Sequence, residues 1–123
     1  MKATEISAPE REIRLCGGAA RVRFDHNQMR QSELYWQWSV GRRLGYLGIV
    51  AQMLDKTFIG LEAIAYGAVA SFQMANGRPP ITMRAFDAAI TYDELLTAAE
   101  ALTGGVKESM PKPRKKADAP AAE

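Results

Sequence analysis

The sequence predicts an α+β domain that is mostly α, in which an N-terminal β-hairpin packs on a bundle of four to five helices and a disordered C-terminal tail follows. Three observations predict this fold. Residues 12–24 alternate apolar and charged side chains on either side of a Gly-Gly pair, as two paired strands do. Residues 58–76 carry apolar side chains at helical spacing. At 123 residues and 47% hydrophobic content, the chain is long enough for one core and too short for two.

Composition divides the chain into three parts. We expect a flexible arm at residues 1–10, because this stretch is mixed in composition and contains Pro9. A single domain made of the hairpin and the helices should occupy residues 11–105. Residues 106–123 are rich in proline, alanine and charge and have almost nothing to bury, so we expect them to be disordered.

The hairpin should have one apolar face and one arginine face. Ile13 and Leu15 point one way from the first strand, and Val22 and Phe24 do the same from the second, with arginines between them. Two strands alone are only marginally stable in water. The hairpin must therefore lie on the helices that follow it.

Two helices are predicted next. Asp25 can cap a helix over residues 29–40, with an amide side chain three residues later at Gln28. Gly41 then favours a break. A second helix over residues 42–55 resumes an apolar stripe, which we expect to face the core and which consists of Leu44, Leu47, Ala51 and Leu54.

Residues 58–76 show the strongest periodicity in the chain and should form the central helix. Thr57 can cap this helix, and Asn76 with Gly77 can end it. One face carries Leu61, Ile64, Ala65, Ala68, Val69 and Phe72. The other side is made of small residues, and Glu62 is the only charge. A helix that is apolar or small all round is normally buried at the centre of a domain, and the alternative is a face left open for a partner.

Two further helices complete the predicted bundle. Thr82 can cap a short helix whose apolar face consists of Met83, Phe86 and Ile90. Residues 91–94 form a capping box for the last helix, and the glycine pair at 104–105 is expected to close it. The apolar stripe of this last helix consists of Leu95, Leu96, Ala99 and Leu102.

The distribution of charge argues against a nucleic-acid-binding domain. Residues 1–105 carry 11 Lys and Arg against 11 Asp and Glu, so the surplus of +2 lies in residues 106–123. A neutral body lacks the basic face that displaces counterions from phosphates. The single Cys16 permits no internal disulfide, no leader opens the chain, and we expect no apolar run of membrane-spanning length. These features favour a soluble, cytoplasmic protein.

The sequence offers little catalytic chemistry. His26 is the only histidine and Cys16 the only cysteine, so neither a nucleophile–base–acid triad nor a structural zinc cluster can be assembled. Carboxylates are scattered singly except at Asp93 and Glu94, which the capping box explains. We therefore expect no enzyme activity, no cofactor and no metal site.

Four segments occur in a recognisable order: the hairpin EIRLCGGAARVRF, a glycine-containing helix ending AQMLDK, the small-residue helix FIGLEAIAYGAVAS and a final TYDELLTAAEAL. This order, over residues 12–105, resembles the tail assembly chaperones of long-tailed bacteriophages and of related gene transfer agents. The run YWQW at residues 35–38 departs from the family pattern.

The resemblance implies a function. Members of that family are small, mostly helical and non-enzymatic, and they bind the tape-measure protein to keep it soluble while the tail tube polymerises around it. They act in the bacterial host cytoplasm and are absent from the mature virion. The partner implied here is thus an apolar, helical tape-measure protein. The tail tube protein and a second copy of the chain are further partners that the resemblance allows, whereas a membrane and nucleic acid are not expected.

A chaperone for such a partner needs broad and adaptable apolar surfaces. Flexible methionines and large aromatic rings supply contacts of that kind. The candidate partner-binding residues are Met29, Tyr35, Trp36, Trp38, Met53, Met74 and Met83. For the methionines, ordinary filling of the core is the alternative.

Two functions from other classes stay open. A structural virion component such as a head–tail adaptor could use the hairpin to join a ring by strand addition. A small nucleic-acid-binding regulator could use the helices and the basic residues of the tail.

Overall fold

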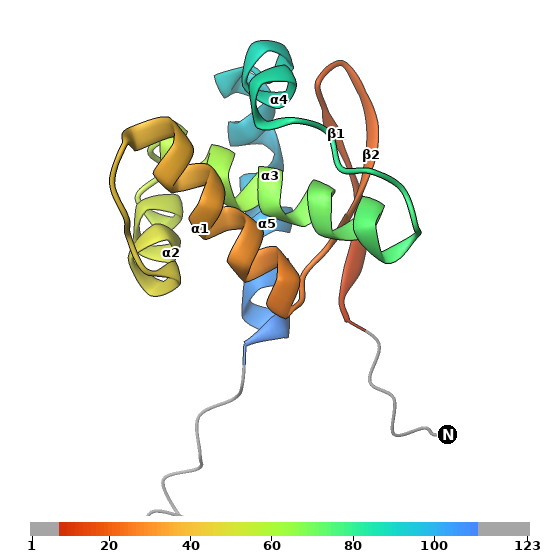
Figure 1. Cartoon of the computed structure of the whole chain (residues 1–123), viewed down its shortest axis with the longest axis horizontal. Coiled ribbons are helices and arrows are strands. Elements are labelled where there is room, and N and C mark those ends of the chain that lie inside the picture. Colours follow the sequence, from red (N-terminus) through yellow and green to blue (C-terminus); the bar gives the residue numbers. More distant parts are fainter. Residues whose placement is uncertain (1–7, 111–123) are drawn as a thin grey trace, which may run out of the picture.

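The computed structural model describes residues 8–110 and shows two strands and five helices within them (Figure 1). The strands β1 (Glu10–Leu15) and β2 (Gly18–Arg23) form an antiparallel hairpin. The helices are α1 (His26–Val40), α2 (Tyr46–Leu54), α3 (Phe58–Ala75), α4 (Met83–Ala89) and α5 (Tyr92–Ser109). The predicted class, α+β and mostly α with an N-terminal hairpin on a helical bundle, is confirmed.

Helix α3 crosses the middle of the molecule, and α1, α2, α5 and β2 all pack against it (Figure 1). Every residue from 60 to 71 is buried, so the prediction of a helix covered on all sides is confirmed, and no face of this segment is open to a partner. Two glycines let the neighbouring helices approach. A Cβ at Gly60 would lie 2.5 Å from the backbone carbon of Gln52 in α2, and one at Gly67 would lie 2.5 Å from the carbonyl oxygen of Gln28 in α1.

By length and composition alone, the 18 residues of α3 could cross a membrane. The expectation that no apolar run reaches that length is therefore wrong. The other elements of the fold cover the apolar surface of α3, and this is the environment of a domain's core helix.

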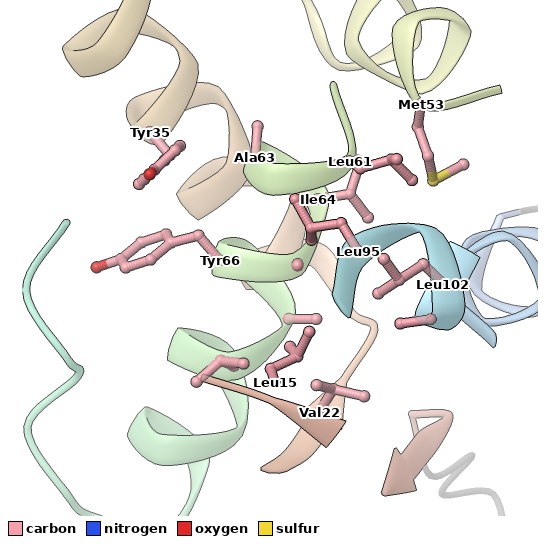
Figure 2. Packing of buried hydrophobic residues seen from close by; sticks show 14 of the residues in the cluster. Leu15, Val22, Tyr35, Met53, Leu61, Ala63, Ile64, Tyr66, Leu95 and Leu102 are labelled. Carbon is pink, nitrogen blue, oxygen red and sulfur yellow. The ribbon is translucent and has the colours of Figure 1, made fainter. Parts of the chain in front are cut away.

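The hairpin turn is tighter than the glycine- and alanine-rich segment suggests. Leu15 pairs with Gly18, so the turn consists only of Cys16 and Gly17, which both have positive φ angles of 54° and 82°. The predicted apolar face is buried: β2 packs on α3 and β1 packs on α5. Figure 2 shows Leu15 and Val22 of the hairpin entering the same core as Leu61 and Ile64 of α3 and Leu95 and Leu102 of α5.

Phe72 departs from its prediction. Leu61 and Ile64 are fully buried as expected, but Phe72 is only half-buried. It lies beyond the fully covered part of α3, next to the arginine face of the hairpin. Its ring has the guanidinium of Arg21 5.6 Å from its centroid and that of Arg78 5.9 Å away.

The buried side of α2 is not the predicted one. The helix begins at Tyr46 rather than near residue 42, and its core-facing residues are Tyr46, Ile49 and Met53. Of the predicted stripe, Leu44 is half-buried, whereas Leu47, Ala51 and Leu54 are exposed. Because α2 is short and apolar on most sides, both stripes fit helical spacing, and only the contact with α3 decides between them.

Helix α5 continues through its glycine pair to Ser109, so the expectation that residues 104–105 close it is wrong. A Cβ at Gly105 would lie 2.5 Å from Cδ1 of Phe24, and the glycine therefore makes room for that ring. Residues 106–109, assigned to the tail from the sequence, belong to the helix, and Glu10, assigned to the arm, begins β1. The disorder predicted for the rest of the tail and the flexibility predicted for most of the arm fall on residues 111–123 and 1–7, which lie outside the described residues.

Candidate functional site

A buried carboxyl group lies at the junction of α1, α3 and α4. Glu62 of α3 is 1% exposed. Tyr35 of α1 donates a hydrogen bond from its hydroxyl to Oε2 of Glu62, and the same hydroxyl lies 3.4 Å from Oδ1 of Asp87 in α4. Glu62 and Asp87 thus lie against the same hydroxyl, close enough for a proton on one carboxyl to bond to the other. We call Tyr35, Glu62 and Asp87 the acid cluster.

Aromatic rings surround the acid cluster. The ring of Tyr35 stacks on that of Tyr66 in α3, with 4.8 Å between centroids (Figure 2). Phe86 of α4 meets Tyr66 edge-on at 5.4 Å and is itself buried. Trp38 lies 5.5 Å from Tyr35 and is 45% exposed. Rings from α1, α3 and the short α4 thus pack around Tyr35, while the side chain of Asp87 is exposed on α4.

Burial shifts the ionisation of this cluster strongly. It raises the pKa of Glu62 to about 7, and Asp87 contributes to the rise through its hydrogen bond and its charge, while the hydroxyl of Tyr35 opposes it. Burial, followed by the hydrogen bond to Glu62, also raises the pKa of Tyr35. Among the ion pairs formed by residues 8–110, none includes Glu62 or Asp87. Glu62 therefore keeps its proton to a higher pH than an exposed carboxyl does, and in that form it can donate a hydrogen bond to Asp87.

The structure thus corrects the expectation that these carboxylates are isolated from one another. Carboxyl groups with shifted pKa values occur both at active sites and in structural networks. Here the carboxyl of Glu62 is closed off from solvent, and its hydrogen-bond partners are side chains of two other helices. This geometry favours a structural role, in which Glu62 of α3 connects α1 and α4. In the described part of the chain, no group of three or more His, Cys, Asp and Glu is arranged to hold a metal ion.

A second candidate site is an exposed apolar surface on α2, the start of α3 and α5. Five large apolar side chains on it are 39% to 68% exposed. We call them the α2–α5 face, and they are Leu47, Leu54, Phe58, Tyr92 and Leu96. Leu54 and Leu96 line a groove of about 400 Å³ between α2 and α5, together with the charged residues Lys56 and Glu100.

The turn between α2 and α3 positions this face. Thr57 caps α3 by accepting a hydrogen bond from the backbone N–H of Gly60, and its hydroxyl donates to the carbonyl oxygen of Gln52 in α2. Tyr92 of α5 donates a hydrogen bond to the carbonyl oxygen of Lys56 and meets Phe58 edge-on at 5.6 Å. These contacts hold the three segments in fixed relation, so the groove is part of the fold.

The structure does not bring the seven predicted partner-binding residues together. Tyr35, Trp36 and Met53 are buried, at 8% exposure or less. They pack in the core, which is the alternative given for the methionine. Tyr35 and Trp36 are thus not exposed anchors in this fold, whereas Met53, although buried, lines the groove between α2 and α5. Partner binding by these residues stays a prediction.

The other four predicted residues lie at separate places on the surface. Met29 and Met83 are half-buried, on α1 and at the start of α4. Trp38 is exposed on α1, and Met74 is exposed near the end of α3, where Asn27 donates a hydrogen bond to its sulfur. Trp38 and Met74 keep the exposure that a partner-binding role requires, and they lie on α1 and at the opposite end of α3 from Phe58.

Sequence reasoning missed both candidate sites for identifiable reasons. The helical spacing of Leu47 and Leu54 is visible in the sequence, but it predicts a stripe that faces the core. Glu62 stood out as the only charge in the central helix, and this was the available signal for the acid cluster. Its pairing with Asp87, 25 residues later, had no local signal.

Comparisons of the chain with protein-family models, with curated proteins and with solved structures find no match.

Proposed function

We propose that this protein is a non-enzymatic tail assembly chaperone, which binds the apolar helices of a tape-measure protein and keeps it soluble in the host cytoplasm until the tail tube encloses it. The proposal combines the resemblance in the order of elements with one structural observation. The α2–α5 face leaves five large apolar side chains exposed, and two of them, Leu54 and Leu96, line a groove between two helices. Exposed apolar surface of this kind marks interaction sites on soluble proteins.

The groove suits an apolar helix of a partner. Leu54 and Leu96 line it from opposite helices, and an amphipathic helix can lay its apolar face between such side chains. The charges of Lys56 and Glu100 are of opposite sign, so the groove has no strong preference for a charged partner. A surface of this type tolerates many apolar sequences, which is what a long helical partner demands.

The proposed binding surface does not lie on the central helix, where an open face was only the alternative to burial. Residues 60–71 of α3 are buried by the chain itself, so a partner cannot reach them while the domain is folded. The apolar stripe of α2 that was expected in the core faces outward instead. It supplies the exposed surface that α3 lacks.

Co-expression with the tape-measure protein tests the proposal. The wild-type chain should keep that protein in the soluble fraction and co-purify with it, and the complex should persist in high salt because apolar contacts are not screened. The variant Leu54→Glu with Leu96→Glu should lose both effects, because it places two charges in the groove. Circular dichroism checks that this variant is folded.

A matched control comes from α1. Leu34 and Val40 are 44% and 41% exposed, close to the exposure of Leu96. Leu34→Glu with Val40→Glu adds the same charge at a distance from the groove and should keep the partner soluble. If the tape-measure protein is equally soluble without this chain, the proposed chaperone function is wrong. If only the α1 variant loses binding, the binding surface lies on α1 and not at the groove.

A structural virion component, such as a head–tail adaptor, is the second candidate function. Within residues 8–110, β1 and β2 form a two-stranded sheet, so each strand has one outer edge without a strand neighbour. Such an edge can accept a strand from another subunit. Finding the protein in purified particles would favour the adaptor, and its absence from them would favour the chaperone.

A further inference from the structure

Helix α4 is held in place by few side chains. Its seven residues are fewer than an isolated helix needs to be stable in water, so contacts with the rest of the domain must keep it helical. Phe86 is the one residue of α4 that is fully buried, and Ile90 follows as the C-cap, also buried. Asp87 reaches the acid cluster beside Phe86. Apart from Phe86 and the half-buried Met83, all residues of α4 are exposed, Asp87 included.

The segment leading into α4 is attached separately. The hydroxyl of Tyr66 donates a hydrogen bond of 2.8 Å to the carbonyl oxygen of Ile81, and the N–H of Ile81 donates one of 2.7 Å to Oε1 of Gln73. Both partners of Ile81 belong to α3. These bonds do not involve the acid cluster, so α4 can loosen while the start of its linker stays fixed.

We infer that α4 is a pH-dependent cover: a proton shared by Glu62 and Asp87 holds it against α1 and α3, and loss of that proton loosens it. The acid cluster links one side chain from each of the three helices. When both carboxyls are ionised, two negative charges face each other where one hydrogen bond had been. Moving α4 outward separates these charges and admits water to Glu62.

Within residues 8–110, no arginine or lysine forms an ion pair with Glu62 or Asp87, so no paired cation offsets this repulsion. The titratable groups around Glu62 are Tyr35 of α1, Tyr66 of α3, Asp87 of α4 and Cys16 of the hairpin turn. All of them are neutral or negative. Arg84 of α4 is exposed, and within the described residues it forms no ion pair with Asp87.

The direction of the pH effect follows from the two states of Glu62. In the closed form its pKa is about 7, whereas in water it returns to 4.5. Between these values the closed form keeps the proton and the open form has lost it. The opening equilibrium should therefore rise about tenfold per pH unit in this window and level off above it. Opening would uncover the rings of Tyr35 and Tyr66 next to the exposed Trp38.

Hydrogen–deuterium exchange on the full chain tests the inference, and no partner is needed. Protection factors, which correct for intrinsic exchange rates, are compared for the backbone amides of residues 83–90. These factors should fall at least about tenfold from about pH 5 to about pH 8. Amides in the middle of α3 should keep theirs. In Glu62→Gln the amide can still accept from Tyr35 and can donate to Asp87, so protection of residues 83–90 should change less than about twofold.

Two further variants complete the test. Glu100→Gln makes the same change at an exposed position of α5 and should respond to pH as the wild type does. Asp87→Asn changes an exposed residue, so it serves as the test even if Glu62→Gln fails to fold. Its amide can donate to the carboxylate of Glu62 in place of the shared proton, so the pH response should be smaller. Equal protection of residues 83–90 at both pH values in the wild type would overturn the inference. So would a Glu62→Gln or Asp87→Asn variant that loses protection as fully as the wild type.

Discussion

Gly105 has a role that depends on a residue far away in the sequence. It lies inside α5, where glycine costs about 1 kcal/mol relative to alanine. The ring of Phe24, from the end of the hairpin, occupies the space that a Cβ at this position would need. The close contact between hairpin and helix therefore outweighs the loss of helix propensity.

Replacing the two neighbouring glycines separates these effects. We expect Gly105→Ala to destabilise the domain by about 1 to 3 kcal/mol, because a methyl group must displace the buried ring. At Gly104 the nearest atoms belong to the end of the Arg11 side chain, which can move. Gly104→Ala should therefore be neutral or stabilising by up to about 1 kcal/mol. Urea denaturation of both variants measures the difference, and equal midpoints would contradict the role given to Gly105.

Asp25 provides stability that disappears in acid. Burial disfavours its charged form, but hydrogen bonds from Ser71, from the N–H of Gln28 and from Arg23 together lower its pKa. Its contribution to stability is present above the usual pKa of a carboxyl and is lost as the pH falls through the lowered value. Glu62 acts in the opposite sense, because its pKa is raised.

The free energy of unfolding should therefore be highest on the acid side of neutrality. Between pH 4.5, the unfolded pKa of Glu62, and about 7, the folded chain holds a proton that the unfolded chain has released, so stability falls as the pH rises. We expect a fall of roughly 2 to 3 kcal/mol across this window. Urea unfolding at several pH values measures it, and Glu62→Gln should remove most of it. A wild-type stability that rises steadily from acid to neutral pH would contradict this assignment.

At the scale of elements, one carboxylate of α5 binds the turn of the hairpin. Glu94 completes the capping box of α5 with Thr91. The same carboxylate accepts hydrogen bonds from the N–H groups of Cys16, at 3.1 Å, and of Gly17, at 2.7 Å. The turn of the hairpin and the start of the last helix thus share an anchor.

Glu94→Ala should therefore cost more than the loss of a helix cap alone. A capping interaction is worth about 1 kcal/mol, and two backbone donors of the turn lose their charged acceptor as well. We expect a total near 2 kcal/mol, together with faster amide exchange in residues 16–17. Asp93→Ala, one residue earlier in the first turn of α5, is the control and should cost less than about 1 kcal/mol. Equal losses from the two variants would show that the hairpin contacts add nothing.

Local chemistry made several elements predictable. The caps at Asp25, Thr57, Thr82 and Thr91 were predicted and are observed, because each depends only on residues within one helical turn. The hairpin follows from alternation over a few residues. The burial of α3 follows from its composition.

Long-range contacts explain what the sequence could not predict. The exposed side of α2 was assigned to the core because two stripes fit the same short helix. The end of α5 was misplaced because the function of Gly105 depends on Phe24. The acid cluster joins Glu62 to Tyr35 and Asp87, 27 residues before it and 25 after it. In each case the deciding neighbour lies outside the window that a local pattern can cover.

At the scale of the whole molecule, the two ends of the described chain meet. Phe24 and the hairpin pack on the last turns of α5, and Arg11 of β1 forms an ion pair of 2.8 Å with Glu108. Glu108 is 57% exposed and Arg11 32%, so solvent screens the pair and it contributes less than about 1 kcal/mol. Val106, at 2% exposure, is the more important contact, because its burial completes the core under the hairpin.

Two truncations locate the end of the folded domain. Ending the chain after Met110 keeps every described contact, whereas ending it after Gly105 removes Val106, the partner of Arg11 and the last turn of α5. Burying a valine side chain stabilises by about 1.5 to 3 kcal/mol, so the shorter chain should be less stable by about 2 kcal/mol or more. Urea denaturation of the two truncated chains under the same conditions measures the difference. If their midpoints coincide, residues 106–110 add nothing to the core, and the domain ends at the glycine pair after all.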